Sequence, residues 1–254
     1  MVPYYDHAGI TIYHGDCREI LPSLPVCDLV VTDPPYAVSV AGAAHVGMAG
    51  KGIRRLDFFA GDDDWGAMIR LVREAVGLAC DRLSAIGSLY AWCGHRQLGS
   101  LVEDMEARGM STRFLVWAKL CPPPPPPGSG WPSGAELCLY AYPAGRTWTM
   151  RDHPARSNVI TADSFRHGQP GKVDHPTQKP FCVIAPLISA SSLPGQTVID
   201  PFMGSGTTLR AAKDIGRNAI GIEIEERYCE IAAKRLAQET LFGIGGGHVL
   251  RDHK

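Results

Sequence analysis

The strongest constraint on the fold is a repeated alternation of strand and helix patterns along the chain. Short apolar runs predict strands, and the amphipathic runs that follow most of them predict helices. A helix that returns the chain between two strands makes those strands parallel. The sequence therefore predicts an α/β fold whose mostly parallel, twisted sheet has helices on both faces. The predicted strands are residues 9–14, 27–32, 87–94, 112–120, 135–143, 196–200 and 218–224, and the predicted helices are residues 17–24, 62–83, 96–109, 181–191, about 209–215 and 225–240.

Three stretches interrupt this alternation. Six consecutive prolines at residues 122–127 predict a stiff polyproline II segment, and the Gly-Ser-Gly that follows predicts a flexible link. Residues 143–171 are mostly polar and show little periodicity, so we expect an irregular insertion there. Residues 41–61 are rich in glycine and alanine, which is typical of a surface loop. At 254 residues, the chain has the size of one main domain.

The composition is that of an ordinary globular protein, with 45% hydrophobic and 20% charged residues. The first residues do not combine a basic segment with an apolar one, and no apolar run is long enough to cross a bilayer, so we expect a cytoplasmic protein without a membrane partner. The eight cysteines form no CxxC pair and no cluster with zinc spacing. We therefore expect reduced core cysteines and no metal site.

A net charge of −1 gives no general attraction to nucleic acid. Binding to DNA would need locally concentrated positive charge, which residues 51–55 and 146–179 supply. The same bias is typical of a solvated surface, and the sequence alone leaves both readings open. The candidate DNA-binding residues are Lys51, Arg54, Arg55, Arg146, Arg151 and Arg166.

A glycine turn joins a predicted strand to a predicted helix near the C-terminal end of the sheet. Gly204 and Gly206 lack side chains there, so a ligand can approach the backbone and the start of the helix. Glu223 ends the next strand, where a carboxylate can accept hydrogen bonds from ribose hydroxyls. Together these residues indicate a cofactor that contains a nucleoside.

The spacing of the turn narrows the choice of cofactor. The chain has no GxxxxGK[ST] motif, and the turn does not match GxGxxG, so a nucleotide triphosphate and a dinucleotide are both poor matches. A cofactor with ribose and adenine but no phosphate, and with a positive sulfonium, tolerates the acidic residues Asp16, Asp33 and Asp200. S-adenosylmethionine meets this description.

Five segments of the chain resemble motifs of the amino-group DNA methyltransferases, which modify adenine N6 or cytosine N4, and their order along the chain is similar too. The stretch "DPPY" at residues 33–36 is similar to their catalytic motif, and "DPFMGSGTT" at residues 200–208 to their cofactor loop. Further similar segments are "GDCREIL" at residues 15–21, "HPTQKP" at residues 175–180 and "GIEIEERY" at residues 221–228. Because the catalytic motif precedes the cofactor loop, the order resembles the β group of this family.

The resemblance implies a Rossmann-like methyltransferase fold, S-adenosylmethionine as the cofactor and double-stranded DNA as the partner. It implies a catalytic domain at residues 1–120 and 175–242, a short target-recognition insertion at residues 121–174 and a flexible tail at residues 243–254. The catalytic residues that it implies are Asp33, Pro34, Pro35 and Tyr36. The cofactor-binding residues that it implies are Asp16, Cys17, Asp33, Thr177, Lys179, Asp200, Pro201, Phe202, Gly204, Ser205, Gly206, Thr207, Thr208 and Glu223.

The "DPPY" stretch has a chemical reason to end a strand. The lone pair of a base amine is delocalised into the ring, and the Asp33 carboxylate and Pro34 carbonyl can free it by accepting the two amino protons. Tyr36 would stack on a base that has been flipped out of the duplex. This route needs no cysteine nucleophile. The simpler reading, that the prolines only end the strand, leaves Asp33 and Tyr36 unexplained.

Aspartate at the first motif position favours adenine N6 as the target, with cytosine N4 as the alternative. Serine at that position resembles many cytosine-N4 enzymes, whereas asparagine resembles relatives that act on RNA or protein. A non-catalytic DNA-binding module and a nicotinamide oxidoreductase are the competing hypotheses from other classes. A cognate restriction endonuclease is a possible partner, and the chain is expected to be a monomer or a homodimer.

Overall fold

The computed structural model describes residues 1–36, 65–122, 130–145, 157–164 and 178–238. Within these residues, nine strands form one sheet in the order β1-β2-β9-β8-β3-β4-β6-β5-β7. The strands are β1 (Tyr5–His7), β2 (Ile10–His14), β3 (Cys27–Thr32), β4 (Leu83–Cys93), β5 (Met110–Lys119), β6 (Ala135–Pro143), β7 (Val159–Ala162), β8 (Thr197–Asp200) and β9 (Asn218–Glu223). The helices are α1 (Cys17–Ile20), the 3-10 helix η1 (Leu21–Ser23), α2 (Trp65–Cys80), α3 (His95–Ala107), α4 (Phe181–Ser191), α5 (Thr207–Asp214) and α6 (Glu226–Ala237).

The centre of the sheet is parallel and its borders are mixed. Strands β2, β9, β8, β3 and β4 run in the same direction, so their carboxyl ends meet at one edge. Strand β6 is antiparallel to both β4 and β5, and β1 is antiparallel to β2. The first residues of β6 therefore lie at the same edge as the last residues of its two neighbours.

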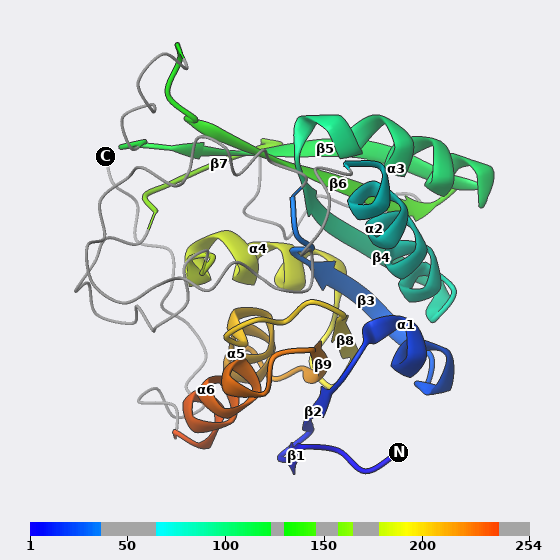
Figure 1. Ribbon diagram of the computed structural model, residues 1–254, viewed down its shortest axis with the longest axis vertical. Helices are drawn as coiled ribbons and strands as arrows, with labels where there is room; N and C mark the ends of the chain where they lie inside the picture. The colour runs from blue at the N-terminus through cyan, green and yellow to red at the C-terminus, as the bar shows by residue number, and fades with distance from the viewer. Residues whose placement is uncertain (37–64, 123–129, 146–156, 165–177, 239–254) are drawn as a thin grey trace.

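Helices cover both faces of the sheet (Figure 1). Helices α4, α5 and α6 pack on one face, and α1, α2 and α3 pack on the other. Strand β3 shows why the centre is stable: Leu29 and Val31 face the first layer, while Val30 faces the second, and all three are fully buried. A strand that is covered on both sides reads as a continuous apolar run.

The structure agrees with most predicted elements and differs at the borders of the sheet. Helix α4 has the predicted bounds, and β9 and α6 differ from theirs by a few residues at one or both ends. The prediction of an irregular insertion at residues 143–171 was wrong for Val159–Ala162, because these residues form strand β7 and pair with β5. Strand β6 also lies in the central sheet, although the sequence assigned residues 121–174 to target recognition.

Several predictions fall outside the described residues. These are the loop at 41–61, the proline segment at 122–127 beyond its first residue, the tail at 243–254, Thr177 and all six candidate DNA-binding residues. Within the described part of the chain, no helix combines the length and apolar composition that a bilayer crossing requires.

Candidate active site

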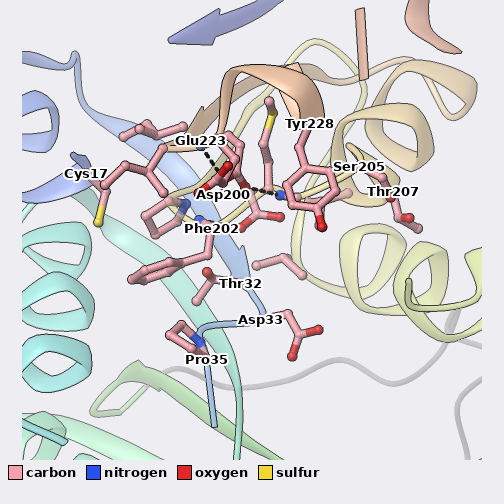
Figure 2. Close-up of a pocket in the computed structure, with 18 of the residues that line it drawn as sticks. Cys17, Thr32, Asp33, Pro35, Asp200, Phe202, Ser205, Thr207, Glu223 and Tyr228 are labelled. Atoms are coloured by element: carbon pink, nitrogen blue, oxygen red, sulfur yellow. Dashed lines mark hydrogen bonds between the residues drawn. The ribbon is translucent and has the colours of Figure 1, made fainter. Parts of the chain in front are cut away.

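A cavity of about 260 Å³ opens at the carboxyl edge of the parallel strands. Its walls come from the residues that end or follow β2, β3, β8 and β9, together with parts of β4, α2 and the start of α4. Figure 2 shows Glu223 and Tyr228 at one end of the group of lining residues and Asp33 with Pro35 at the other. A ligand that fills the cavity therefore reaches from the glycine turn to the turn at residues 33–36.

The Glu223 carboxylate is fixed at the end of β9 by two backbone amides. Its Oε2 accepts a hydrogen bond from the Gly204 N–H at 3.0 Å, and its Oε1 accepts one from the Glu225 N–H at 2.9 Å. Burial raises the pKa of Glu223, although these amides oppose the shift. Each carboxylate oxygen can accept a further hydrogen bond, so the group is held in place and still available to a ligand hydroxyl.

Asp200 ends β8 and is 2% exposed. Its Oδ1 accepts a hydrogen bond from the Phe202 N–H at 3.1 Å. Burial raises the pKa of Asp200 to about 7, while hydrogen bonds from Thr208 and from the Phe202 amide hold the rise back. The floor of the cavity thus carries a carboxyl group that is charged only in part near neutral pH.

The two predicted glycines have different roles in the turn. Gly204 lines the cavity and donates its N–H to Glu223. Gly206 does not line the cavity; it caps α5 in the left-handed conformation, with φ of +77°. A Cβ atom at Gly206 would lie 2.9 Å from the Ala232 Cβ of α6, so this position permits close helix packing.

Asp16 caps helix α1 and lines the cavity. Its Oδ1 accepts the Arg18 N–H at 2.8 Å, and the Arg18 guanidinium lies 2.6 Å from its Oδ2. The hydrogen bonds from Arg18 lower the pKa of Asp16 and keep it charged. The next residue, Cys17, also lines the cavity, and burial raises the pKa of its thiol to about 12, so it is a protonated thiol at neutral pH.

The turn at residues 33–36 is braced by side chains from other elements. The Tyr36 hydroxyl lies 2.9 Å from Asp33 Oδ1, and the Lys179 Nζ lies 2.7 Å from Asp33 Oδ2. The Pro35 carbonyl accepts a hydrogen bond from Gln97 Nε2 at 3.0 Å, and Gln97 Oε1 in turn accepts the Gly94 N–H at the start of α3. The acceptor Asp33 is therefore held in one orientation while its side chain stays 25% exposed.

Sequence reasoning missed Glu136, the second residue of β6. Its carboxylate lies 2.9 Å from Lys179 Nζ and 2.8 Å from Lys119 Nζ. Burial alone would raise the pKa of Glu136, but the two lysines outweigh it and hold the pKa below its usual value. Lys179 was predicted at the cofactor; it lines the cavity, and it also bridges Asp33 and Glu136. One sequence feature could have revealed Glu136: it is the only charged residue in the otherwise apolar strand β6.

Three polar atoms on the cavity wall lack a hydrogen bond. Among the described residues, the Thr32 hydroxyl, the Trp92 indole N–H and the Thr207 hydroxyl are buried there without one. Buried donors without partners are costly, so they indicate a polar ligand in this space. Thr207 was predicted from sequence, whereas Trp92 was not, because it is one more apolar residue in a buried strand.

The structure brings most of the predicted site residues together at one cavity. Pro34, Tyr36 and Gly206 do not line it, although Tyr36 contacts Asp33. Residues that sequence reasoning did not select, such as Gln178 and Tyr228, do line it. The predicted residues on its wall are Asp16, Cys17, Asp33, Pro35, Lys179, Asp200, Pro201, Phe202, Gly204, Ser205, Thr207, Thr208 and Glu223.

The fold and the cavity define a class of protein. A parallel sheet with helices on both faces, a glycine turn before a helix and a backbone-held carboxylate on the next strand are the features of a Rossmann-like methyltransferase. The comparisons with known proteins give the family.

A family model described as DNA methylase, which covers N6 and N4 methyltransferases, matches residues 27–234. The Type II methyltransferase M.HinfI of Haemophilus influenzae is 30% identical over 254 residues, which covers 90% of this chain and 68% of the relative. The chain therefore belongs to the family of amino-group DNA methyltransferases, as the motifs predicted.

Solved structures have the same fold. The crystal structure of the M1.HpyAVI–SAM complex has a TM-score of 0.64 and 26% identity, and the match covers 89% of this chain and 99% of that chain. The PvuII DNA methyltransferase, described as cytosine-N4-specific, has a TM-score of 0.72 and 17% identity, with coverage of 94% and 90%. The predicted fold class is confirmed.

Proposed function

We propose that this DNA methyltransferase transfers the methyl group of S-adenosylmethionine to the N6 amino group of adenine. The observation that carries the proposal is the placement of Asp33, whose partly exposed carboxylate lies on the wall of the same cavity as Glu223 and Asp200. An acceptor for the amine and a binding site for the cofactor thus share one space. An aspartate at this position favours adenine.

The described residues fit S-adenosylmethionine. Glu223 has free lone pairs for ribose hydroxyls, and the charged Asp16 puts a carboxylate on the cavity wall, which a cofactor with a sulfonium and no phosphate tolerates. The unpartnered donors of Trp92 and Thr207 would find acceptors on the cofactor. When bound, the cofactor supplies an electrophilic methyl group on a positively charged sulfur.

The residues of the 33–36 turn prepare the amine. The Asp33 carboxylate and the Pro34 carbonyl accept the two amino protons, so the nitrogen lone pair is freed from the ring and directed at the methyl carbon. As the carbon–nitrogen bond forms, the carbon–sulfur bond breaks and its electron pair stays on sulfur. The amine then releases one proton to Asp33 or to water. Tyr36 stacks on the flipped base.

Cytosine N4 is the second candidate target. Its exocyclic amine is delocalised in the same way and needs the same pair of acceptors, and the fold of the cytosine-N4-specific PvuII enzyme covers 94% of this chain. The two targets differ in the ring that the base-binding region must hold, which the order of the motifs does not specify.

The target base is tested with purified protein, isotopically labelled S-adenosylmethionine and PCR-amplified DNA, which carries no methylation. We expect the label in N6-methyladenine when nucleosides are analysed by mass spectrometry. Label in N4-methylcytosine would show that the target is cytosine and would leave the proposed mechanism unchanged. Saturable cofactor binding without any labelled base would point to RNA, to another substrate or to a non-catalytic module.

The role of Asp33 is tested by Asp33→Ala in the same assay. We expect methyl transfer to fall at least about 100-fold, because an acceptor that acts in the transition state affects the rate more than binding. The dissociation constant for S-adenosylmethionine should change little. Unchanged turnover in this variant would contradict the proposed role.

DNA recognition is proposed from sequence alone. The catalytic domain would comprise residues 1–120 and 175–242 together with strands β6 and β7 of the sheet, with recognition by the rest of residues 121–174 and by the basic cluster at 51–55. A cognate restriction endonuclease, a monomeric or homodimeric state and a cytoplasmic location remain predictions. Mass photometry of the purified chain, with and without DNA, would test the oligomeric state.

A further inference from the structure

Four charged side chains form a compact cluster beside the catalytic motif. Lys179 Nζ lies 2.7 Å from Asp33 Oδ2 and 2.9 Å from Glu136 Oε2, and Lys119 Nζ lies 2.8 Å from Glu136 Oε1. The side chains of Lys179, Lys119 and Glu136 are 7%, 12% and 17% exposed. The two carboxylates and two ammonium groups balance, which a buried cluster requires because an uncompensated charge is strongly unfavourable there.

The Tyr36 hydroxyl has two possible acceptors in this cluster. Its oxygen lies 2.9 Å from Asp33 Oδ1 and 3.1 Å from Glu136 Oε2, and it accepts a hydrogen bond from Lys179 at 3.0 Å. A hydroxyl has one proton, so it donates to only one carboxylate at a time. Burial and both carboxylates raise the pKa of Tyr36, so it keeps that proton at neutral pH.

Both oxygens of Asp33 are already engaged in this arrangement, by Tyr36 and by Lys179. Each of these oxygens can accept a further hydrogen bond, so a base amine that binds Asp33 either shares them with Tyr36 and Lys179 or displaces these donors. If Asp33 were their only acceptor, the displaced donors would be left buried without a partner, at about 1–3 kcal/mol for each neutral group. Glu136 removes this penalty, because a rotation of the Tyr36 O–H redirects its proton without moving the ring.

We propose that Glu136 is a positioning residue that takes up the hydrogen bonds of Tyr36 and Lys179 when the target amine binds Asp33. The inference rests on the proposed function, since it concerns the same reaction. Glu136 does not contact the reacting atoms. It makes the Asp33 carboxylate available to the amine, while Tyr36 and Lys179 keep a hydrogen-bond acceptor.

Charge gives Glu136 a second effect on the same step. The amine gains positive charge as it forms a bond to the methyl carbon. Without the carboxylate of Glu136, Asp33 would be the only carboxylate in a cluster with two ammonium groups. The cluster would then carry a net positive charge beside the amine that is gaining positive charge. A loss of Glu136 should therefore slow transfer more than it weakens cofactor binding.

Two variants separate the hydrogen bond from the charge. Glu136→Gln keeps an acceptor oxygen and removes the charge, whereas Glu136→Leu removes both. The matched control is Glu230→Gln, which removes an exposed carboxylate from its ion pair with Lys234 on α6. Each protein is measured for its single-turnover rate on PCR-amplified DNA, its dissociation constant for S-adenosylmethionine by calorimetry and its melting temperature.

We expect the transfer rate to fall about tenfold in Glu136→Gln and about 100-fold in Glu136→Leu, with cofactor affinity within about twofold of the wild type. The control should behave as the wild type. In a Tyr36→Phe background, which has no hydroxyl to accommodate, Glu136→Leu should cause a smaller loss.

The outcomes distinguish this inference from the function on which it rests. No label in any base with the wild type would overturn both. Normal transfer by the wild type and by both Glu136 variants would overturn the inference alone, as would a loss of rate matched by an equal loss of cofactor affinity. If Glu136→Leu does not fold, Glu136→Gln decides: a wild-type rate overturns the inference, and a slower rate with intact cofactor affinity supports it.

Discussion

Two buried carboxyl groups at the site, Asp200 and Glu136, differ in charge at neutral pH because their surroundings shift their pKa values in opposite directions. Burial raises the pKa of Asp200 to about 7, and the hydrogen bonds that it accepts only partly oppose this rise. Glu136 is flanked by two lysines, which hold its pKa below the usual value in spite of burial. The chain thus keeps the Glu136 carboxylate charged near the turn at residues 33–36 and lets Asp200, at the glycine turn, lose part of its charge near neutral pH.

The raised pKa of Asp200 predicts how stability depends on pH. Because the pKa in the folded protein is about 7 and the ordinary value is 3.8, the protonated group stabilises the fold below pH 4, and this contribution is lost as the pH rises through 7. Asp200→Asn should therefore be more stable than the wild type at pH 8, by up to about 4 kcal/mol, and similar to it at pH 4.

Urea unfolding of both proteins between pH 4 and pH 8 checks this expectation. The control Asp81→Asn removes an exposed aspartate and should show no such gain. A difference between Asp200→Asn and the wild type that does not grow with pH would contradict the assigned cause.

Glu223 predicts a cofactor effect at the residue scale. In Glu223→Gln, the amide NH₂ would face one of the two backbone N–H donors that now point at the carboxylate. We expect the dissociation constant for S-adenosylmethionine to rise about tenfold or more. Calorimetry checks this, with Glu226→Gln on the exposed start of α6 as the control. An unaltered constant would count against a contact between Glu223 and the cofactor ribose.

The junction of the glycine turn with α5 depends on a close contact between helices. Gly206 has φ of +77°, and an added Cβ would meet Ala232 of α6 at 2.9 Å. Gly109 has the same φ, but a Cβ there would meet nothing within 4 Å. The two positions share backbone strain and differ in packing.

Gly206→Ala should therefore destabilise the fold more than Gly109→Ala. We expect about 1 kcal/mol from strain in both variants and a further 1–3 kcal/mol from overpacking at Gly206. Chemical denaturation measures both, and cofactor affinity should fall only in the first. Equal losses in the two variants would show that packing against α6 contributes little.

The direction and length of the strands explain which parts of the site and of the sheet could be predicted from the sequence. The acidic residues at the ends of parallel strands were found because these ends share one edge of the sheet. Glu136 was missed because β6 runs the opposite way, so its first residues reach that edge, and strand direction is not evident from an apolar pattern. Strand β7 was missed because four residues carry little periodicity and are defined by pairing with β5.

At the scale of the whole molecule, DNA binding must work against a net charge of −1. Local clusters then carry the electrostatic attraction, and sequence assigns one of them to residues 51–55. Replacing Lys51, Arg54 and Arg55 by alanine should weaken binding to all DNA sequences. The slope of log affinity against log salt should fall by up to about 2.7, if each residue neutralises one phosphate.

Filter binding at several salt concentrations measures this slope. Lys234→Ala, which removes one exposed charge on α6, is the control and should leave the slope unchanged. A triple variant with the wild-type slope would place the phosphate contacts elsewhere, with the basic residues of 146–179 as the next to test.

The hairpin of β5 and β6 has a practical consequence for engineering. Lys119 is the last residue of β5 and Glu136 is the second residue of β6, so the connection between the strands starts and finishes beside the charged cluster near Asp33. A chimera that exchanges this connection with that of a relative can join the two chains only after Lys119 and before Glu136. Grafts that replace Lys119 or Glu136 would change the charged cluster beside Asp33, so a loss of turnover would accompany any change that the new connection makes in specificity.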